Sequence, residues 1–254
     1  MPLLEIKGLT HHFGGLCAVS DFDLNIEPSE IVGIIGPNGA GKTTVFNILT
    51  GIYRAEKGSI LLNGAQIVGK PPAFIAASGI GRAFQNIRLF NGMSVLDNIR
   101  VAYFNNTRYG VLGSLFHTRR YRKEEHRIID QAMGLLSLFE MDHLAFELAG
   151  NLPYGLQRRL EIVRALATRP HLLLLDEPAA GMNPKEIDQL IEFIHMIHKE
   201  YRLSIILIEH QMRLVMNICQ RMKVLDFGTT IAEGNPEAIQ NDPIVLEAYL
   251  GLKT

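Results

Sequence analysis

The chain has 254 residues, of which 47% are apolar and 20% charged, an ordinary composition for a folded globular protein. This length fits one large domain or two small ones. With 25 basic and 26 acidic residues the net charge is −1, which argues against a broad electrostatic surface for nucleic acid. No apolar run approaches the roughly 18–20 residues that cross a bilayer, and no signal-peptide pattern opens the chain. We therefore expect a cytosolic protein with reduced thiols at Cys17 and Cys219.

Short apolar runs predict the buried strands of the fold. Their length and their Val, Ile and Leu content are typical of strands covered on both faces. The runs are 31–35, 60–62, 172–175, 204–208 and 222–227. Helical patterns alternate with several of them, over 43–49, 184–200 and 214–219. Strands that alternate with helices predict an α/β fold with a mostly parallel sheet.

The middle of the chain has a different, mainly helical pattern. Helical spacing is found over 95–102, 122–139 and 157–167. We interpret 94–167 as a helical subdomain inserted into an α/β core made of 1–93 and 168–254, all within a single domain, 1–254.

A basic run lies inside this helical part, and residues 104–122 show no clean period. Only Glu124 and Glu125 oppose its seven basic side chains, which are Arg100, Arg108, Arg119, Arg120, Arg122, Lys123 and Arg127. The simplest interpretation is a solvated face. The alternative is contact with a partner or with anionic lipid headgroups.

A phosphate-binding loop is the strongest chemical signal. It follows the strand 31–35, opens a helix, and consists of Gly36, Pro37, Asn38, Gly39, Ala40, Gly41, Lys42 and Thr43. Its glycines permit the backbone conformations by which successive N–H groups form an anion cradle at a helix N-terminus. Lys42 then supplies a charge for the β- and γ-phosphates, and the Thr43 hydroxyl is placed to ligate Mg²⁺. The loop predicts a site for ATP.

Further polar residues follow apolar segments of the chain. Asp176 and Glu177 end the run 172–175, where one carboxylate suits Mg²⁺ held through water and the other suits a general base. His210 follows the run 204–208, and parallel pairing of these two strands would bring it to the same sheet edge as a donor to the γ-phosphate. Gln85 ends the apolar segment before the helical part and is a further candidate ligand of Mg²⁺.

The order of these motifs resembles the nucleotide-binding subunit of an ABC transporter over nearly the whole chain. More narrowly, several stretches are similar to the LivG-type ATPase of branched-chain amino-acid importers. These are FGG at 13–15, GPNGAGKTT at 36–44, TVFN at 44–47, YGLQRRLEI at 154–162, DEPAAGMNP at 176–184 and EAYLG at 247–251. The resemblance implies an ABC-type P-loop NTPase fold with an N-terminal antiparallel β part.

The resemblance also implies roles for single residues. Phe13 matches the position of an aromatic ring that stacks on adenine, and Thr44 extends the phosphate loop. Thr43, Gln85 and Asp176 would hold Mg²⁺, with Glu177 as the base and His210 as the γ-phosphate switch. A signature segment would complete the ATP site of a second subunit, and here it is Leu152, Pro153, Tyr154, Gly155 and Leu156. Pro153 stands where the family usually has serine, so a hydroxyl and a backbone N–H are missing.

The resemblance implies partners as well. They are a second ATPase subunit, either a sister or a copy of this chain, in a head-to-tail dimer, two membrane-spanning permease subunits, and indirectly a periplasmic-type solute-binding protein. The chain would then sit at the cytoplasmic face of the inner membrane, with residues 85–102 as a docking surface and Arg88, Leu89 and Phe90 as its anchors. Three alternatives stay open. They are a soluble ABC ATPase acting on nucleic acid or ribosomes, a binding-only regulatory subunit whose altered signature leaves it non-catalytic, and an importer ATPase for another small polar solute.

Overall fold

A computed structural model describes residues 1–103 and 118–250, without the side chain of residue 250. Contacts divide the chain into two compact units: unit 1 combines Met1–Gln85 with the part of the chain from His171 onward, and unit 2 is Asn86–Pro170. The predicted helical subdomain, 94–167, lies within unit 2, and its role as a subdomain stays a prediction. In the ranges that the structure describes, no helix is both long and apolar enough to cross a membrane.

Unit 1 begins with an antiparallel sheet of four strands in the order β2-β1-β4-β5. The strands are β1 (Leu4–Phe13), β2 (Leu16–Ile26), β4 (Lys57–Leu62) and β5 (Ala65–Gln66). Each neighbouring pair runs antiparallel. The expected N-terminal antiparallel part is therefore confirmed.

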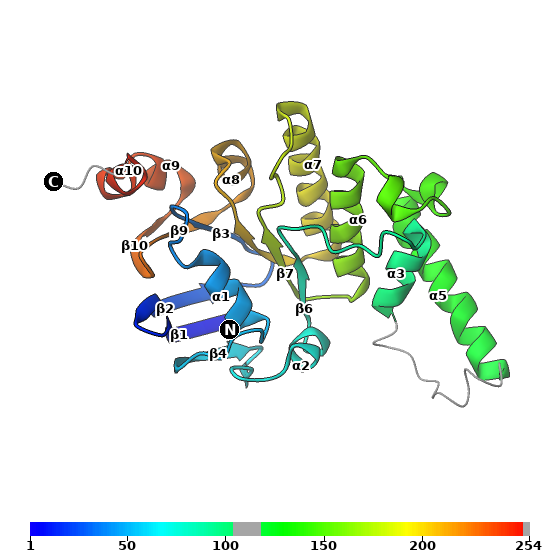
Figure 1. Cartoon of the computed structure of the whole chain (residues 1–254), viewed down its shortest axis with the longest axis horizontal. Coiled ribbons are helices and arrows are strands. Elements are labelled where there is room, and N and C mark those ends of the chain that lie inside the picture. Colours follow the sequence, from blue (N-terminus) through cyan, green and yellow to red (C-terminus); the bar gives the residue numbers. More distant parts are fainter. Residues whose placement is uncertain (104–117, 251–254) are drawn as a thin grey trace. The chain divides into compact units, whose positions relative to one another are not determined.

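A second sheet of six strands, in the order β10-β9-β3-β8-β7-β6, carries the middle of unit 1 (Figure 1). Its strands are β3 (Ile31–Ile35), β6 (Ile80–Ala83), β7 (Leu172–Asp176), β8 (Ser204–Ile208), β9 (Arg221–Asp226) and β10 (Thr229–Gly234). All pairs are parallel except that of β9 with β10. This confirms the mostly parallel sheet, and β7 and β8 are neighbours as predicted.

The helices of unit 1 cover both faces of the six-stranded sheet. They are α1 (Lys42–Leu49), α2 (Pro72–Ala77), α7 (Pro184–Tyr201), α8 (Met212–Ile218), α9 (Pro236–Gln240) and α10 (Pro243–Leu250). After β3, the next strand of this sheet is β6, at one edge. From there β7, β8 and β9 are added across the sheet in the reverse direction, past β3 to its other side. Because such crossovers are right-handed, α1 lies on one face and α7 and α8 on the other (Figure 1). Ligands bind where the direction reverses, at the carboxyl ends of β3 and β8.

One apolar core joins α1 to both sheets. Val45, Phe46 and Leu49 of α1 are fully buried in a cluster that includes residues of β1, β2 and β4 on one side and of β3, β7 and β8 on the other. Each such buried side chain contributes on the order of 1.5–3 kcal/mol through the hydrophobic effect. The helix that opens at the phosphate loop is thus held firmly between two layers.

Unit 2 is helical, with α3 (Val95–Tyr103), α5 (Arg119–Leu138) and α6 (Tyr154–Ala167), and with two short 3₁₀ turns at Asp142–Leu144 and Ala149–Asn151. On α6 the buried ion pair of Arg158 and Glu161 has an N···O distance of 2.8 Å. Glu161 also accepts a hydrogen bond from the backbone N–H of Arg88. The segment that follows Gln85 is therefore tied to α6 within this unit.

Several predicted bounds differ from the structure, among them the strand predicted over 60–62, which begins at Lys57, and the helix predicted over 214–219, which is Met212–Ile218. Three differ for a clear local reason. The strand predicted over 222–227 ends at Asp226, because Phe227 and Gly228 both have positive φ and form a two-residue hairpin turn to β10. Helix α5 begins at Arg119 rather than 122, since the Thr118 side chain accepts a hydrogen bond from the Tyr121 N–H and caps it. Helix α6 begins directly after Pro153, three residues before the predicted start at 157.

Candidate active site

The phosphate loop requires glycine at two positions for reasons of space and of backbone conformation. Gly36 has φ 146°, and a Cβ there would lie 2.0 Å from the carbonyl oxygen of Leu225. Gly41, the residue before α1, has φ 100°, and its Cβ would lie 2.2 Å from the carbonyl oxygen of Ala18. The loop therefore packs directly on backbone of β9 and β2, which fixes its path around a bound anion.

Lys42 lies at the base of this loop. Its side chain is 7% exposed, and Nζ donates hydrogen bonds to the carbonyl oxygens of Gly36 at 2.7 Å and Pro37 at 2.8 Å. Burial lowers the pKa of Lys42, while the negative charges of Glu177 and Asp176 act in the opposite direction. The ammonium is thus held at the base of the loop by two backbone carbonyl oxygens.

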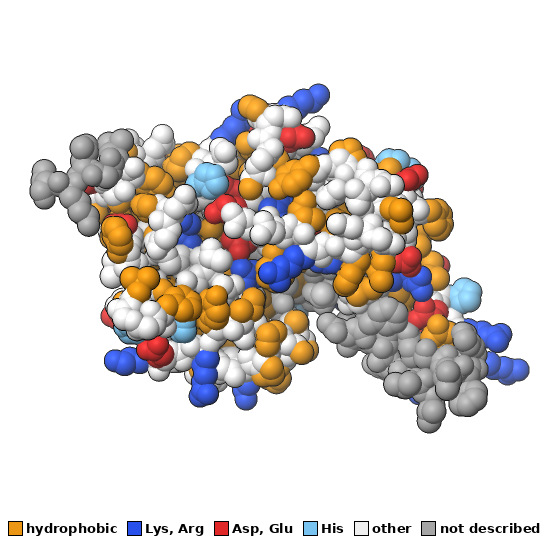
Figure 2. Space-filling view, in the orientation of Figure 1, with side chains coloured by type: hydrophobic (Ala, Val, Ile, Leu, Met, Phe, Trp, Pro, Cys, Tyr) orange, Lys and Arg blue, Asp and Glu red, His pale blue; other side chains and the backbone are white. Residues whose placement is uncertain are grey.

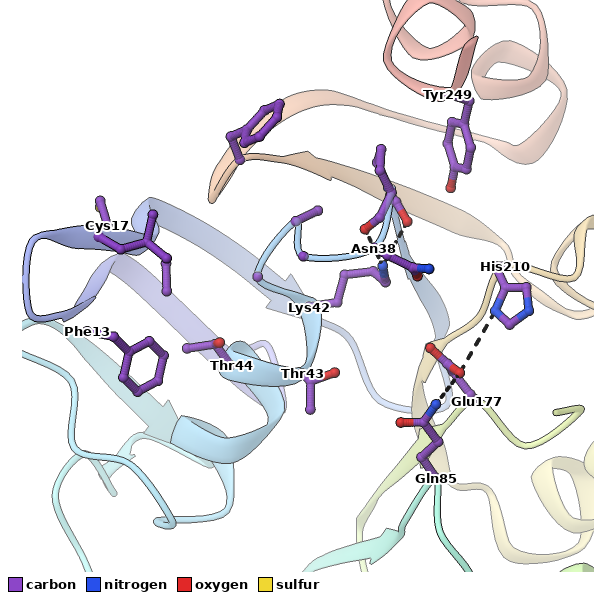
Figure 3. Close-up of a pocket in the computed structure, with 18 residues that line it drawn as sticks. Phe13, Cys17, Asn38, Lys42, Thr43, Thr44, Gln85, Glu177, His210 and Tyr249 are labelled. Carbon is purple, nitrogen blue, oxygen red and sulfur yellow. Dashed lines mark hydrogen bonds and ion pairs between the residues drawn. The ribbon is translucent and has the colours of Figure 1, made fainter. Parts of the chain in front are cut away.

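A cavity of about 940 Å³ opens over the loop and brings most of the predicted residues together (Figure 3). This is near the upper end of the range of about 300–1,000 Å³ for ligand sites. Its lining comprises Phe13, Leu16, Cys17, Ala18, every residue from Gly36 to Thr44, Gln85, Glu177, His210, Phe227 and Tyr249. The apolar and polar parts of the lining suit a ligand with an apolar ring and an anionic end.

Phe13 lies at the apolar end of the cavity. Its ring is 45% exposed and contacts Tyr53 edge-on, with 5.2 Å between centroids, and His11 at 4.7 Å. Hydrophobic side chains gather over this end of β1 and β2 (Figure 2). An exposed ring that is supported from behind offers a surface for a planar base.

Glu177, Gln85 and His210 form a row at the opposite end (Figure 3). Gln85 Nε2 donates a hydrogen bond to Glu177 Oε2 at 2.6 Å, and His210 Nδ1 lies 4.0 Å from the same oxygen. Glu177 has φ 44°, a conformation that costs a non-glycine residue about 1–3 kcal/mol and is often found at functional sites. The structure thus brings the three residues together. Neighbouring parallel strands predicted this for Glu177 and His210, but not for Gln85.

Asp176 lies next to this row and is 2% exposed. Its Oδ2 accepts a hydrogen bond from Arg82, whereas Oδ1 is buried without a hydrogen-bond partner in the structure. Thr43 stands in the first turn of α1 and lines the cavity. A carboxylate oxygen and a hydroxyl are ligands that Mg²⁺ prefers, so the donor set fits the ion together with phosphate oxygens. No group of three or more His, Cys, Asp or Glu side chains in residues 1–103 and 118–250 is placed to hold a metal alone.

Sequence reasoning missed three residues of this site. Arg82 pairs with Asp176, and Glu209 is fully buried with its carboxylate in contact with the His210 loop. Tyr249, from the last described helix, points toward the loop near Asn38 (Figure 3). Burial raises the pKa of the Tyr249 hydroxyl, and a hydrogen bond with the Gly36 backbone opposes this shift. Two of them had an available signal, because Glu209 stands beside His210 and Tyr249 lies in the EAYLG stretch. Arg82 had none, because its partner Asp176 is distant in the sequence.

The predicted signature lies in unit 2 and opens α6. Pro153 is the N-cap residue and makes no side-chain hydrogen bond there, while Gln157 Nε2 donates to the carbonyl oxygen of Leu152 at 2.8 Å. Because the helix begins at Tyr154, its first N–H groups come from the signature itself. Among the predicted docking anchors, Arg88 and Phe90 are exposed and Leu89 is half-buried.

The basic run is partly paired within unit 2. Arg100 forms ion pairs with Asp97 at 2.6 Å and Glu125 at 2.8 Å, and Arg127 pairs with Glu124 at 3.2 Å. Arg108 lies outside the described residues. Figure 2 shows Lys and Arg side chains gathered over the start of α5. For Arg100 and Arg127, these ion pairs within the unit support the simpler interpretation over contact with a partner or with lipid headgroups.

Fold and site together define the class of the protein as a phosphate-loop nucleotide-binding protein with a mostly parallel α/β core. The sequence model of the family described as "ABC transporter" matches residues 19–180. A second model, described as "Branched-chain amino acid ATP-binding cassette transporter", matches residues 229–251, which include Tyr249.

Similar proteins narrow this class further. The branched-chain amino acid transport ATP-binding proteins BraF of Pseudomonas aeruginosa and LivG of Escherichia coli K12 are each 46% identical over 250 residues, with 98% of both chains covered. The crystal structure of an ATP-binding cassette of an ABC transporter in its ADP conformation has a TM-score of 0.86 at 30% identity, covering 99% of each chain. The chain therefore belongs to the ABC transporter ATP-binding proteins, within the LivG and BraF group of branched-chain amino acid transport.

Proposed function

We propose that this protein hydrolyses ATP to energise the import of branched-chain amino acids. One observation carries the hydrolysis: Glu177 lies at the rim of the phosphate-loop cavity, with Gln85 hydrogen-bonded to its carboxylate and His210 beside it. A carboxylate that follows the metal aspartate directly is the group expected of an ATPase that activates water. The names of the full-length relatives support branched-chain amino acids as the transported solute.

Each residue of the site has a definite task in this mechanism. The loop N–H groups and Lys42 bind the phosphates, and Phe13 supports the adenine ring. Mg²⁺, held by Thr43, Gln85 and, through water, Asp176, would neutralise phosphate charge when bound. Glu177 accepts a proton from the attacking water.

Two further contacts keep this arrangement in order. The Gln85 amide, 2.6 Å from Glu177 Oε2, orients that carboxylate. His210 is exposed and free to donate a hydrogen bond to the terminal phosphate when ATP is present. The site therefore contains both the base and a group that distinguishes ATP from ADP.

Substitution of Glu177 by glutamine tests the proposal. Glu177→Gln should bind ATP with an affinity within about threefold of the parent, while turnover falls about 10²–10⁴-fold, the usual contribution of a positioned base. Single-turnover ATP hydrolysis in the assembled complex measures this. Glu192→Gln, the same change at an exposed position of α7, is the matched control. Near-normal hydrolysis by Glu177→Gln would show that another group is the base.

The complex that we propose has the partners implied by the family. A second ATPase subunit, sister or identical, pairs head to tail with this one, two permease subunits span the membrane, and a periplasmic-type binding protein delivers the solute. The chain is then attached peripherally at the cytoplasmic face. Leucine, isoleucine or valine uptake by vesicles that contain the assembled complex should depend on internal ATP. Uptake of an unrelated polar solute instead would overturn the assigned substrate.

A soluble ABC ATPase that acts on nucleic acid or ribosomes is the alternative. The near-neutral charge argues against it, and the full-length relatives named above are transport proteins. A gel-shift assay at physiological salt should show no binding of DNA or RNA.

A further inference from the structure

Arg82 occupies a buried position between the metal-site aspartate and helix α1. Its side chain is 5% exposed, and Nη2 donates a hydrogen bond to Asp176 Oδ2 at 2.6 Å. Its other terminal nitrogen, Nη1, donates to Asn47 Oδ1 at 2.9 Å and to Thr50 Oγ1 at 3.1 Å. One guanidinium thus joins two elements that are far apart in sequence.

Aromatic rings hold this guanidinium from its sides. Its central carbon lies 4.6 Å from the ring centroid of Phe84 and 5.5 Å from that of Phe46. A planar guanidinium with several donors suits such a site, whereas a lysine ammonium is a point charge without a fixed fork. Because taking two charges out of water is costly, an ion pair this deeply buried is weak evidence for a role in stability alone.

The elements joined by Arg82 are those that carry the predicted metal ligands. Arg82 lies on β6, in register with Leu174 of the neighbouring strand β7, and β7 ends at Asp176. Asn47 and Thr50 lie at the far end of α1, whose first turn carries Thr43. By holding Oδ2, Arg82 fixes the rotation of the Asp176 carboxylate and leaves Oδ1, the oxygen without a partner, as the one available to a metal-bound water.

We propose that Arg82 is a positioning residue of the metal site, which selects the free oxygen of Asp176 and sets its place relative to Thr43. This inference rests on the proposed function, because it concerns the Mg²⁺ that accompanies ATP. Residues that orient metal ligands from the second shell typically change metal affinity 10–100-fold when they are replaced.

Arg82→Lys in a Glu177→Gln background, where nucleotide is bound but not consumed, tests the role of Arg82. A fluorescent ATP analogue is titrated first in EDTA and then, at a fixed concentration, with Mg²⁺. Affinity in EDTA should stay within about threefold of the background, since the phosphate loop is untouched. The Mg²⁺ concentration at the midpoint of the second titration should be roughly 10–100-fold higher than in the background protein. A merely structural role would weaken binding equally in EDTA and in Mg²⁺, and that result would overturn the proposal.

Two further variants make the result unambiguous. Thr50→Val removes one acceptor of the guanidinium but keeps the arginine, so it should fold and increase the midpoint about threefold. Arg213→Lys makes the same change in an exposed ion pair with Asp188 and should leave the midpoint unchanged. If the background protein shows no Mg²⁺ dependence, the proposed metal site itself fails. If the background protein does depend on Mg²⁺, but Arg82→Lys and Thr50→Val have the same Mg²⁺ midpoint as that background, only the role of Arg82 is excluded.

Discussion

The two cysteines illustrate at the residue scale how position decides reactivity. Cys17 lines the nucleotide cavity and is partly exposed, whereas Cys219 is buried beneath β3. Burial raises the pKa of the Cys219 thiol to about 12. At pH 8 only about one Cys219 in ten thousand is then a thiolate, the reactive form.

We predict that a thiol reagent at pH 8 modifies Cys17 in the folded protein and leaves Cys219 unmodified. ATP should slow the reaction of Cys17, because the ligand fills the cavity that this side chain lines. The single variants Cys17→Ser and Cys219→Ser assign the two rates, and denaturant should expose the second thiol. Rapid labelling of the Cys17→Ser variant under native conditions would contradict the burial of Cys219, and equal rates with and without ATP would contradict the position of Cys17.

Single residues were also where sequence reasoning reached its limit. Asp176, Glu177 and His210 were predictable because each lies within two residues of the end of a buried apolar run, and strand ends are where α/β proteins bind ligands. Arg82 was not predictable from its neighbours in the chain, since its partner Asp176 lies 94 positions away. Which charges meet across such a distance depends on strand order, and no local pattern contains that order.

Glu209 connects two elements of the site. Its Oε1 accepts a hydrogen bond from the Ala179 N–H at 2.8 Å, in the loop after β7. Its Oε2 accepts from the N–H groups of His210 at 2.9 Å and Gln211 at 3.1 Å, in the loop after β8. One fully buried carboxylate thus fixes the loop after Glu177 and the loop of His210 to each other.

We predict that Glu209→Gln lowers turnover about tenfold or more, because an amide replaces one of the two accepting oxygens and faces an N–H group. The unmatched donors should also reduce the free energy of unfolding by about 1–3 kcal/mol. A double-mutant cycle on single-turnover rates separates the two effects. If Glu209 acts through His210, the change should have little further effect in a His210→Ala background. Additive losses would show that Glu209 affects turnover by a route that does not involve His210.

At the scale of elements, strands were more predictable than helix ends. The runs at 31–35 and 204–208 coincide with β3 and β8, because strands covered on both faces are uniformly apolar. The starts of α5 and α6 were placed three residues too late, since charged and polar residues of a first turn show no apolar period. Caps such as Thr118 and Pro153 set those starts.

At the level of the whole molecule, the predicted ATP-binding motifs are divided between the two units. The phosphate loop, the carboxylates and the histidine all belong to unit 1, whereas the signature lies in unit 2 and, by family resemblance, serves the ATP of a second subunit. Sequence alone indicated this arrangement through the order of motifs, but not how the altered signature begins its helix. Pro153 has no hydroxyl and no N–H, so a composite site completed by this signature would lack a donor. We infer that this site is the weaker of two unequal ATP sites.

Substitution of Pro153 tests this inference in the assembled complex. Serine restores both donors, whereas alanine restores the N–H alone, so Pro153→Ala is the matched control. Serine at this N-cap should stabilise the isolated chain by about 1 kcal/mol relative to alanine, which thermal unfolding measures. A hydroxyl that also reaches the γ-phosphate adds about 1.5–3 kcal/mol, a gain of roughly 10–100-fold in ATP-driven subunit association and a matching increase in ATPase rate at low ATP. If serine and alanine differ in thermal stability but not in association or rate, the signature makes no hydroxyl contact with nucleotide, and the two sites are not unequal for this reason.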